Sequence, residues 1–235
     1  MSENFDITSV PKDGYLIFAL SMSRLANAQS GKAIYDFVKF FESKIRYISI
    51  DAIVLYTNDL YLNSDDKAVD VRKKSLGQML NHKGELLKPI LRDKKYVPQA
   101  FHFLPWDYVI LNADNFQESQ RLLAEAFKNN NDFHDIVLAD LKNQGRETSD
   151  TNISFILEEI VVTYLMLEKQ ISLPNTLTNP DSWRMICYPG IPIESLKFAC
   201  REKLLPQNKD RAEDKLKFRH SFYNMEEKVI IDLDK

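Results

Sequence analysis

The chain has 235 residues, of which 44% are hydrophobic and 11% aromatic, enough to fill one sizeable core. This composition excludes a disordered tail or a small disulfide scaffold. Only six residues are glycine, and neither G-x-G-x-x-G nor G-x-x-x-x-G-K-[ST] can be written from them, which excludes the ATPases, kinases and NAD enzymes that use those phosphate loops. The net charge of −3 argues weakly against a nucleic-acid partner until its distribution is considered.

The sequence shows no pattern of a metal site, a secretion signal or a membrane span. Cys187 and Cys200 form no C-x-x-C motif, and no histidine stands at ligand spacing from either, so we expect no metal. Residues 1–14 carry acids and a proline but no apolar run, unlike a signal peptide. The longest apolar stretches fall short of the roughly 18 residues that a membrane span needs. We therefore expect a cytoplasmic protein with no membrane partner.

Short apolar or β-branched runs alternate with helical patterns along the chain. We expect strands at 15–20, 47–56, 108–111 and 184–188, and helices at 30–44, 67–95, 115–128 and 151–169. A Pro105-Trp106-Asp107 turn would precede the third strand. The chain from Pro206 on is charged and loosely patterned, and we expect it to wrap the outside, with 229–233 docking as a helix or a strand. The alternation predicts an α/β fold, a Rossmann-like mainly parallel sheet with helices on both faces, in a single domain over 1–235.

The basic residues gather in one segment of the chain. Between Lys67 and Lys95 nine basic residues stand against three acidic ones, so this window carries +6 and the remainder of the chain −9. An apolar stripe at helical spacing leaves most of the basic residues on the other faces. The stripe consists of Ala68, Val71, Leu76, Met79 and Leu80. A basic helical face on an acidic body is typical of a protein that holds a phosphate backbone, although a solvated lysine-rich surface fits about as well.

Two predicted strands carry polar side chains at their carboxyl ends, where ligands bind in a parallel α/β sheet. Ser21 directly follows the strand 15–20, and Tyr188 ends the strand 184–188. A hydrolase with a Ser-His-Asp triad is disfavoured, because Ser21 does not lie in a G-x-S-x-G motif and none of the four histidines stands close to it in sequence.

The long apolar helix at 151–169 carries a third candidate element. Tyr164 and Glu168 stand four residues apart, so they share one helical face. A carboxylate is costly to bury unless it has a cationic or hydrogen-bonding partner, so Glu168 is either functional or only the polar end of its helix. Glu158 and Glu159, farther back along the helix, could simply face solvent.

Taken in order, these segments resemble tRNA-dependent cyclodipeptide synthases over roughly residues 14–204. The sequences FALSMSR (18–24), YLMLE (164–168) and MICYPG (185–190) occur in the order and spacing of that family, and the basic segment lies where the family carries its tRNA-binding helix. Pro189 after Tyr188 is similar to the branch of the family that has Tyr-Pro in place of Tyr-His. In that branch the position three after the serine varies, and here it is Arg24.

The resemblance implies a fold similar to the catalytic domains of class I aminoacyl-tRNA synthetases. Members of the family use charged tRNA and need no ATP, so the resemblance implies no cofactor. It implies a ping-pong reaction in which two aminoacyl-tRNAs are consumed per turnover, through an aminoacyl-Ser21 enzyme and a dipeptidyl-enzyme, to release a cyclic dipeptide (diketopiperazine).

The resemblance also assigns roles to individual residues. Glu168 would hold the substrate α-ammonium with Tyr164 beside it, and Tyr188 would relay a proton or support the tetrahedral intermediate. Ala19, where the family usually has glycine, would narrow the first aminoacyl pocket. Arg24 and Pro189 would also belong to the substrate pocket. The residues expected to hold tRNA phosphates are Arg72, Lys73, Lys74, Lys83, Lys88, Arg92, Lys94 and Lys95.

Some features leave alternatives open. Ser23 is a rival nucleophile, and the proline that usually follows the glutamate of the family, as Glu-x-Pro, is absent after Glu168. A tRNA-binding protein of the same fold without turnover, and a transferase that passes the aminoacyl group to another acceptor, are the other two functions considered. The sequence does not indicate which amino acids are joined, and a monomer and a dimer fit it equally.

Overall fold

The computed structural model describes residues 13–20, 27–44, 49–57, 68–92, 101–171, 183–207 and 220–235. Within them, six strands form one sheet in the order β3-β2-β1-β4-β5-β6. The strands are β1 (Asp13–Leu20), β2 (Ser49–Tyr56), β3 (Phe101–Pro105), β4 (Trp183–Tyr188), β5 (Ser221–Asn224) and β6 (Val229–Asp232). All neighbouring strands run parallel except β5 and β6, which are antiparallel.

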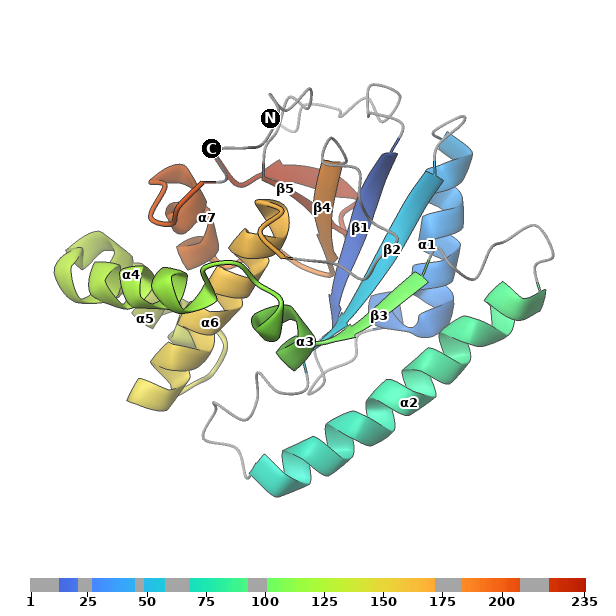
Figure 1. Cartoon of the computed structure of the whole chain (residues 1–235), viewed down its shortest axis with the longest axis horizontal. Helices are drawn as coiled ribbons and strands as arrows, with labels where there is room; N and C mark the ends of the chain where they lie inside the picture. Colours follow the sequence, from blue (N-terminus) through green and yellow to red (C-terminus); the bar gives the residue numbers. More distant parts are fainter. Residues whose placement is uncertain are drawn as a thin grey trace.

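Helices flank the sheet on both sides (Figure 1). They are the 3-10 helix η2 (Asn27–Gln29) and the α-helices α1 (Gly31–Lys44), α2 (Ala68–Arg92), α3 (Trp106–Leu111), α4 (Phe116–Asn129), α5 (Asn131–Asn143), α6 (Asp150–Leu167) and α7 (Glu194–Arg201). In Figure 1, α1 and α2 pack together at one side of the sheet, and α4 to α7 form a second group at the other side. The core of buried apolar side chains runs from Tyr15 in β1 to Leu233 near the end of the chain. No helix among the described residues has the length and apolar character that crossing a membrane requires.

The predicted fold class and most of the predicted elements are confirmed. The observed β1, α1, β2, α2, α4, α6 and β4 agree with the predictions to within a few residues at their ends. Of the two alternatives for 229–233, the strand is the one observed, as β6. The helix α6 begins where the Ser149 hydroxyl accepts a hydrogen bond from the Asn152 N–H, a capping contact that satisfies an otherwise free backbone donor.

Two predictions about secondary structure were wrong. The third strand is Phe101–Pro105, and the predicted strand 108–111 belongs instead to the short helix α3. Four apolar residues cannot distinguish a buried strand from a buried helical turn. The chain from Pro206 does not simply wrap the outside either, because β5 lies inside the sheet between β4 and β6 and all four of its residues are buried.

The order of the strands reverses direction at one position in the sheet. The chain proceeds outward from β1 to β2 and β3, and then returns to the other side of β1 with β4. In sheets of this order, ligands bind at the carboxyl ends of the two strands where the direction reverses. Here those strands are β1 and β4. The fold therefore marks the ends of these two strands as the candidate site.

Candidate active site

The carboxyl ends of β1 and β4 lie side by side at the switch point. Phe18 pairs with Cys187, so Tyr188, the last residue of β4, stands level with Ala19 of β1. Ser21 continues directly from Leu20 but lies outside the described residues, as do Ser23 and Arg24. The structure therefore brings Tyr188 next to the end of β1, and the backbone from which Ser21 continues is defined up to Leu20.

Hydrogen bonds from neighbouring segments fix the end of β1. The Thr57 hydroxyl donates to the Leu20 carbonyl at 2.6 Å, and the Gln29 side-chain amide donates to the Ala19 carbonyl at 2.8 Å. Thr57 and Gln29 are both buried, which protects these bonds from competition with water. The strand end that leads to Ser21 is therefore tied to both the adjacent strand and η2.

The end of β4 is fixed by an asparagine. The buried Asn224 side-chain oxygen accepts hydrogen bonds from the backbone N–H groups of Gly190, Glu226 and Glu227 at 3.3, 3.0 and 3.1 Å. Gly190 has φ +95°, a conformation that favours glycine. Tyr188 and Pro189 are half-buried on the chain that enters this turn. Asn224 carries no local sequence signal, and the sequence analysis did not identify it.

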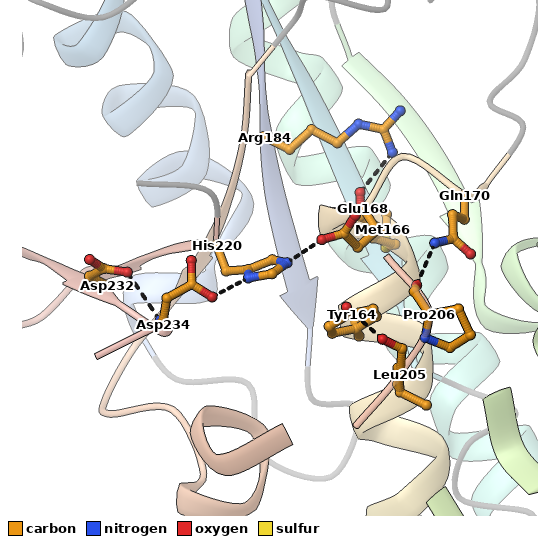
Figure 2. A network of polar contacts seen from close by, with 10 residues as sticks. All are labelled: Tyr164, Met166, Glu168, Gln170, Arg184, Leu205, Pro206, His220, Asp232 and Asp234. Carbon is orange, nitrogen blue, oxygen red and sulfur yellow. Dashed lines mark hydrogen bonds and ion pairs between the residues drawn. The ribbon is translucent and has the colours of Figure 1, made fainter. Parts of the chain in front are cut away.

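Glu168 lies in a buried polar network (Figure 2). Its carboxylate accepts a hydrogen bond from His220 Nε2 at 2.6 Å, and His220 Nδ1 donates to Asp234 at 2.6 Å. The side chains of Glu168 and His220 are fully buried, whereas that of Asp234 is 36% exposed. The Tyr164 hydroxyl donates to the Leu205 carbonyl at 3.1 Å, and its ring packs 5.3 Å from that of His220. Tyr164 and Glu168 therefore belong to one cluster, as their four-residue spacing predicts.

The two carboxylates determine the charge of His220. Burial alone would lower the pKa of this imidazole, but the hydrogen bonds to Asp234 and Glu168 and the charges of both outweigh burial and raise the pKa. Carboxylates only accept hydrogen bonds, so both ring nitrogens donate and the imidazole carries a positive charge. His220 is thus the cationic partner that a buried Glu168 requires, and sequence reasoning did not identify it.

This network lies toward the amino ends of the strands. His220 precedes β5 and is level with Arg184, because Met185 pairs with Ser221. Arg184 in turn pairs with Tyr15 near the start of β1, and its guanidinium donates to the Met166 carbonyl at 2.8 Å. Leu20 stands five residues farther along β1 than Tyr15, which is about 17 Å at the rise of a β-strand.

The structure therefore does not bring all of the sequence candidates together. It places Tyr188 beside the end of β1. It places Tyr164 and Glu168 in the His220 network, toward the other end of the sheet. The substrate-binding role of Glu168 stays a prediction. The observed hydrogen bond of Glu168 connects the carboxyl end of α6 to His220, which directly precedes β5.

Another buried carboxylate is bonded to a residue at the carboxyl end of a strand. Glu158 in α6 is 4% exposed and accepts a hydrogen bond from the indole N–H of Trp106 at 2.7 Å. Trp106 directly follows Pro105, the last residue of β3, which pairs with Tyr56 at the carboxyl end of β2. Glu158 does not face solvent, the possibility left open from the sequence. Trp106 and Glu158 are 52 residues apart, so no local pattern could have paired them.

The neighbouring Glu159 has an altered acidity. Burial raises the pKa of its carboxyl to about 7, with Asp140 adding to the rise and Arg146 opposing it. A carboxyl with this pKa changes between its neutral and its negatively charged form near neutral pH. Glu159 is half-buried, so this change of charge occurs at the margin of the core.

The basic residues of α2 lie outward. The side chains of Lys73, Lys74, Lys83, Lys88 and Arg92 are all exposed, while His82, Leu86 and Ile90 form the buried face. Lys83 lies over the Phe103 ring, 4.9 Å from its centroid. The side chain of Arg72 and the residues Lys94 and Lys95 lie outside what the structure describes. The predicted apolar stripe differs from the packed face, because Leu76 and Leu80 are 51% and 59% exposed.

A groove of about 520 Å³ runs between α1 and α2. Lys32, Lys88 and Arg92 line it together with Asp36 and Glu85. Both signs of charge are therefore present along its walls.

Among the residues that the structure describes, no three His, Cys, Asp or Glu side chains converge so that they could hold a metal ion. Cys187 and Cys200 are buried and unbridged.

Neither protein-family models nor curated proteins match this chain. Solved structures do. A Mycobacterium tuberculosis protein, described as showing that cyclodipeptide synthetases are related to type I tRNA synthetases, aligns over 92% of this chain and 86% of its own, with 14% identity and TM-score 0.55. The cyclodipeptide synthase AlbC from Streptomyces noursei aligns over 92% and 97%, with 13% identity and TM-score 0.52. A cyclodipeptide synthase from Candidatus Glomeribacter gigasporarum, solved bound to Phe-tRNAPhe, aligns over 88% and 92%, with 15% identity and TM-score 0.52. The chain therefore shares the fold of cyclodipeptide synthases, which are related to class I tRNA synthetases.

Proposed function

We propose that this chain is a cyclodipeptide synthase, a single cytoplasmic catalytic domain that joins two aminoacyl groups from aminoacyl-tRNAs into a cyclic dipeptide. One observation carries the proposal. In a fold shared with cyclodipeptide synthases, a serine follows β1 and a tyrosine ends β4, at the switch point where such sheets bind ligands. The FALSMSR and MICYPG segments supply these two residues, so the sequence resemblance and the topology agree on the same edge.

Ser21 would be the acyl acceptor. Its hydroxyl attacks the ester carbonyl of the first aminoacyl-tRNA, the Ser21 oxygen–carbon bond forms, the bond to the terminal ribose oxygen breaks, and that oxygen takes the proton. The amine of the aminoacyl group on Ser21 then attacks the ester carbonyl of the second aminoacyl-tRNA, because only this direction leaves the dipeptide on Ser21. A peptide bond forms, the bond to the terminal ribose oxygen of the second tRNA breaks, and that oxygen takes the proton that the amine loses. Finally the free amine of the dipeptide attacks the Ser21 ester, which closes the ring and restores the hydroxyl.

The substrates are already activated esters, so positioning contributes more than a strong base. Tyr188, level with the end of β1, would relay the proton or support the tetrahedral intermediate during these transfers. Ala19, Arg24 and Pro189 would shape the substrate pocket, with Ala19 narrowing the part that holds the first aminoacyl group. The exposed cations of α2 would hold the phosphates of tRNA, positioning it without reading its sequence.

A carboxylate would hold the α-ammonium of the substrate by charge-assisted hydrogen bonds. The sequence resemblance gives this role to Glu168, with Tyr164 beside it. The structure favours considering Glu158 as well, because it is buried and its partner Trp106 follows the carboxyl end of β3. Substituting each carboxylate by glutamine separates the two possibilities.

Mass spectrometry of culture medium from a bacterial host expressing the chain tests the proposal. The wild type is expected to release cyclic dipeptides, Ser21→Ala to release none, and the matched control Ser23→Ala to release them near the wild-type level. Product from Ser21→Ala but not from Ser23→Ala would move the nucleophile to Ser23.

Folded wild-type protein that releases no cyclic dipeptide would contradict the proposal. The alternatives would then be separated by the state of the protein after incubation with aminoacyl-tRNA. A covalent aminoacyl adduct would favour a transferase to another acceptor. Binding without an adduct would favour a tRNA-binding protein without turnover.

A further inference from the structure

A chain of buried hydrogen bonds joins the basic helix α2 to the end of β1. The Tyr56 hydroxyl lies 2.9 Å from His82 Nδ1, and His82 Nε2 lies 2.9 Å from the Gln29 carbonyl oxygen. Through its side-chain amide, Gln29 donates to the Ala19 carbonyl at 2.8 Å. His82 and Gln29 are 3% and 2% exposed. The chain thus runs from the middle of α2 to a backbone atom two residues before Ser21.

The partners of His82 settle which atoms donate. A backbone carbonyl can only accept, so His82 Nε2 carries the hydrogen that bonds Gln29. Burial lowers the pKa of His82, with the bond to Gln29 and the charge of Glu85 opposing the change in part, so the imidazole is neutral at neutral pH. Its Nδ1 then accepts from the Tyr56 hydroxyl. Since both ring nitrogens are occupied and buried, His82 is not available as an acid or base for a substrate.

The segment between β1 and α1 is held at both of its ends. At the β1 end, the Leu20 and Ala19 carbonyls accept from Thr57 and Gln29. At the α1 end, Gly31 packs against the α2 backbone so closely that an added Cβ would lie 2.6 Å from the Leu86 nitrogen. Leu20 and Gly31 are therefore held by contacts with Thr57 and with α2, respectively.

We propose that His82 is a positioning residue that couples the tRNA-binding helix to the nucleophile, by holding Gln29 so that Gln29 fixes the exit of β1 before Ser21. The inference rests on the proposed function, which supplies the roles of α2 and Ser21. Helix α2 would contribute its exposed cations to tRNA on one face and the hydrogen bond from His82 to Gln29 on the other. Docking of tRNA and placement of the nucleophile would then depend on one rigid element.

Two variants that each keep one polar position of the imidazole test this coupling. His82→Gln places an amide N–H close to the Nε2 position and keeps the donor to Gln29, whereas His82→Asn places its polar atoms near Nδ1 and leaves the Gln29 carbonyl without that donor. Each variant loses one of the two bonds, so similar losses of thermal stability are expected. His82→Asn is expected to lower kcat about ten-fold or more with KM for aminoacyl-tRNA unchanged, and His82→Gln to stay within about three-fold of wild type, because small misplacements of reacting groups are costly.

Hydrogen exchange provides a readout that does not require activity. In His82→Asn, peptides covering residues 13–20 and 27–34 are expected to exchange faster than in wild type, while peptides from β4 and β5 stay unchanged. His82→Gln is expected to keep wild-type protection in all of them. A wild type without synthase activity would overturn the proposed function, and the exchange pattern would still decide whether His82 holds the exit of β1.

Two results would overturn the coupling. Equal losses of kcat and equal exchange in the two variants, following their losses of stability, would make His82 a structural residue only. A change in KM with kcat retained would show that His82 acts on tRNA binding and not on the nucleophile.

Discussion

Two buried histidines lie near opposite edges of the sheet, the carboxyl edge where the parallel strands end and the amino edge where they begin, and their neighbours leave one neutral and the other positively charged. His82, near the carboxyl end of β1, lies between a hydroxyl and a carbonyl, and burial lowers its pKa. His220, toward the amino end of β5, lies between two carboxylates that raise its pKa despite its burial. Burial alone therefore does not determine the charge of a histidine in this protein, and the acceptors around it do.

The neutral His82 and the charged His220 stabilise the fold in two different ways. The hydrogen bonds that hold the exit of β1 involve no ionised group, whereas those that tie α6 to the end of the chain are ionic. A neutral hydrogen bond contributes about 1 kcal/mol, and removing one partner of a buried ion pair costs about 3–5 kcal/mol. The amino edge should therefore dominate stability, and the carboxyl edge should respond mainly in activity.

The largest expected effect comes from applying the same substitution at both histidines. His220→Gln leaves the fully buried Glu168 without its cation and should lower the free energy of unfolding by about 3 kcal/mol or more. Asp234 is partly exposed and adds little to this loss. His82→Gln keeps one of its two bonds and should cost about 1 kcal/mol. Urea denaturation measures both, and equal losses would remove the distinction between the edges.

Glu158 in α6 and Glu168, which directly follows α6, sharpen the comparison next. In Glu168→Gln the charge that pairs with His220 is lost, but the amide oxygen can still accept from Nε2 and Asp234 still pairs with the imidazolium. A smaller loss of about 1–3 kcal/mol in stability is therefore expected. In Glu158→Gln the amide oxygen can still accept from the Trp106 indole, so stability should change little. Product formation then identifies the group that holds the substrate amine. Loss of product in the stable Glu158→Gln would place that role at the carboxyl edge, and loss confined to Glu168→Gln would return it to Glu168.

The stability of the protein should depend on pH in opposite ways at the two sites. Because the folded pKa of His220 is raised above its unfolded value of 6.5, its contribution is complete below pH 6.5 and is lost as the pH rises through the folded pKa. The folded pKa of His82 is lowered, so its neutral form favours folding at higher pH and stability is lost as the pH falls below 6.5.

Urea denaturation of the wild type and of His220→Gln across pH 5 to 9 would separate the two contributions. The wild type should lose more stability than the variant on the alkaline side. Parallel curves for the two proteins on that side would contradict the charged state assigned to His220.

The smallest expected effect concerns the exposed charges of α2. Reversing Lys73 and Lys74 to glutamate should weaken tRNA binding several-fold and flatten its salt dependence, because fewer counterions would be released. Lys128→Glu combined with Lys142→Glu makes the same change of net charge on the exposed sides of α4 and α5, and should leave binding nearly unchanged. Equal effects of the two pairs in filter binding at several salt concentrations would show that only net charge matters.

Much of the fold was predictable because its signals are local. The apolar run of β1, the β-branched run of β2 and the long apolar pattern of α6 each determine their own secondary structure, and the alternation of the elements determines the parallel sheet. Strand β5 could not be recognised in this way, because four residues carry no detectable period. Helices α5 and α7 and the 3-10 helix also went unpredicted.

The site was predictable only in part, because only some of its residues carry a local sequence signal. Ser21 and Tyr188 follow predicted strands, and topology alone brings the ends of those strands together. The partners of buried polar groups come from segments far apart in sequence, so no pattern indicates them. Glu168 and His220 are 52 residues apart, as are Trp106 and Glu158, and His82 is 53 residues from Gln29.

The most direct test of the account is the intact mass of purified protein after brief incubation with aminoacyl-tRNA and quenching in acid. The account predicts that the wild type gains the mass of one aminoacyl group, that proteolysis places this mass on Ser21, and that Ser21→Ala gains nothing. A folded wild type that binds aminoacyl-tRNA but gains no mass, or that carries the group on a different residue, would contradict the central claim.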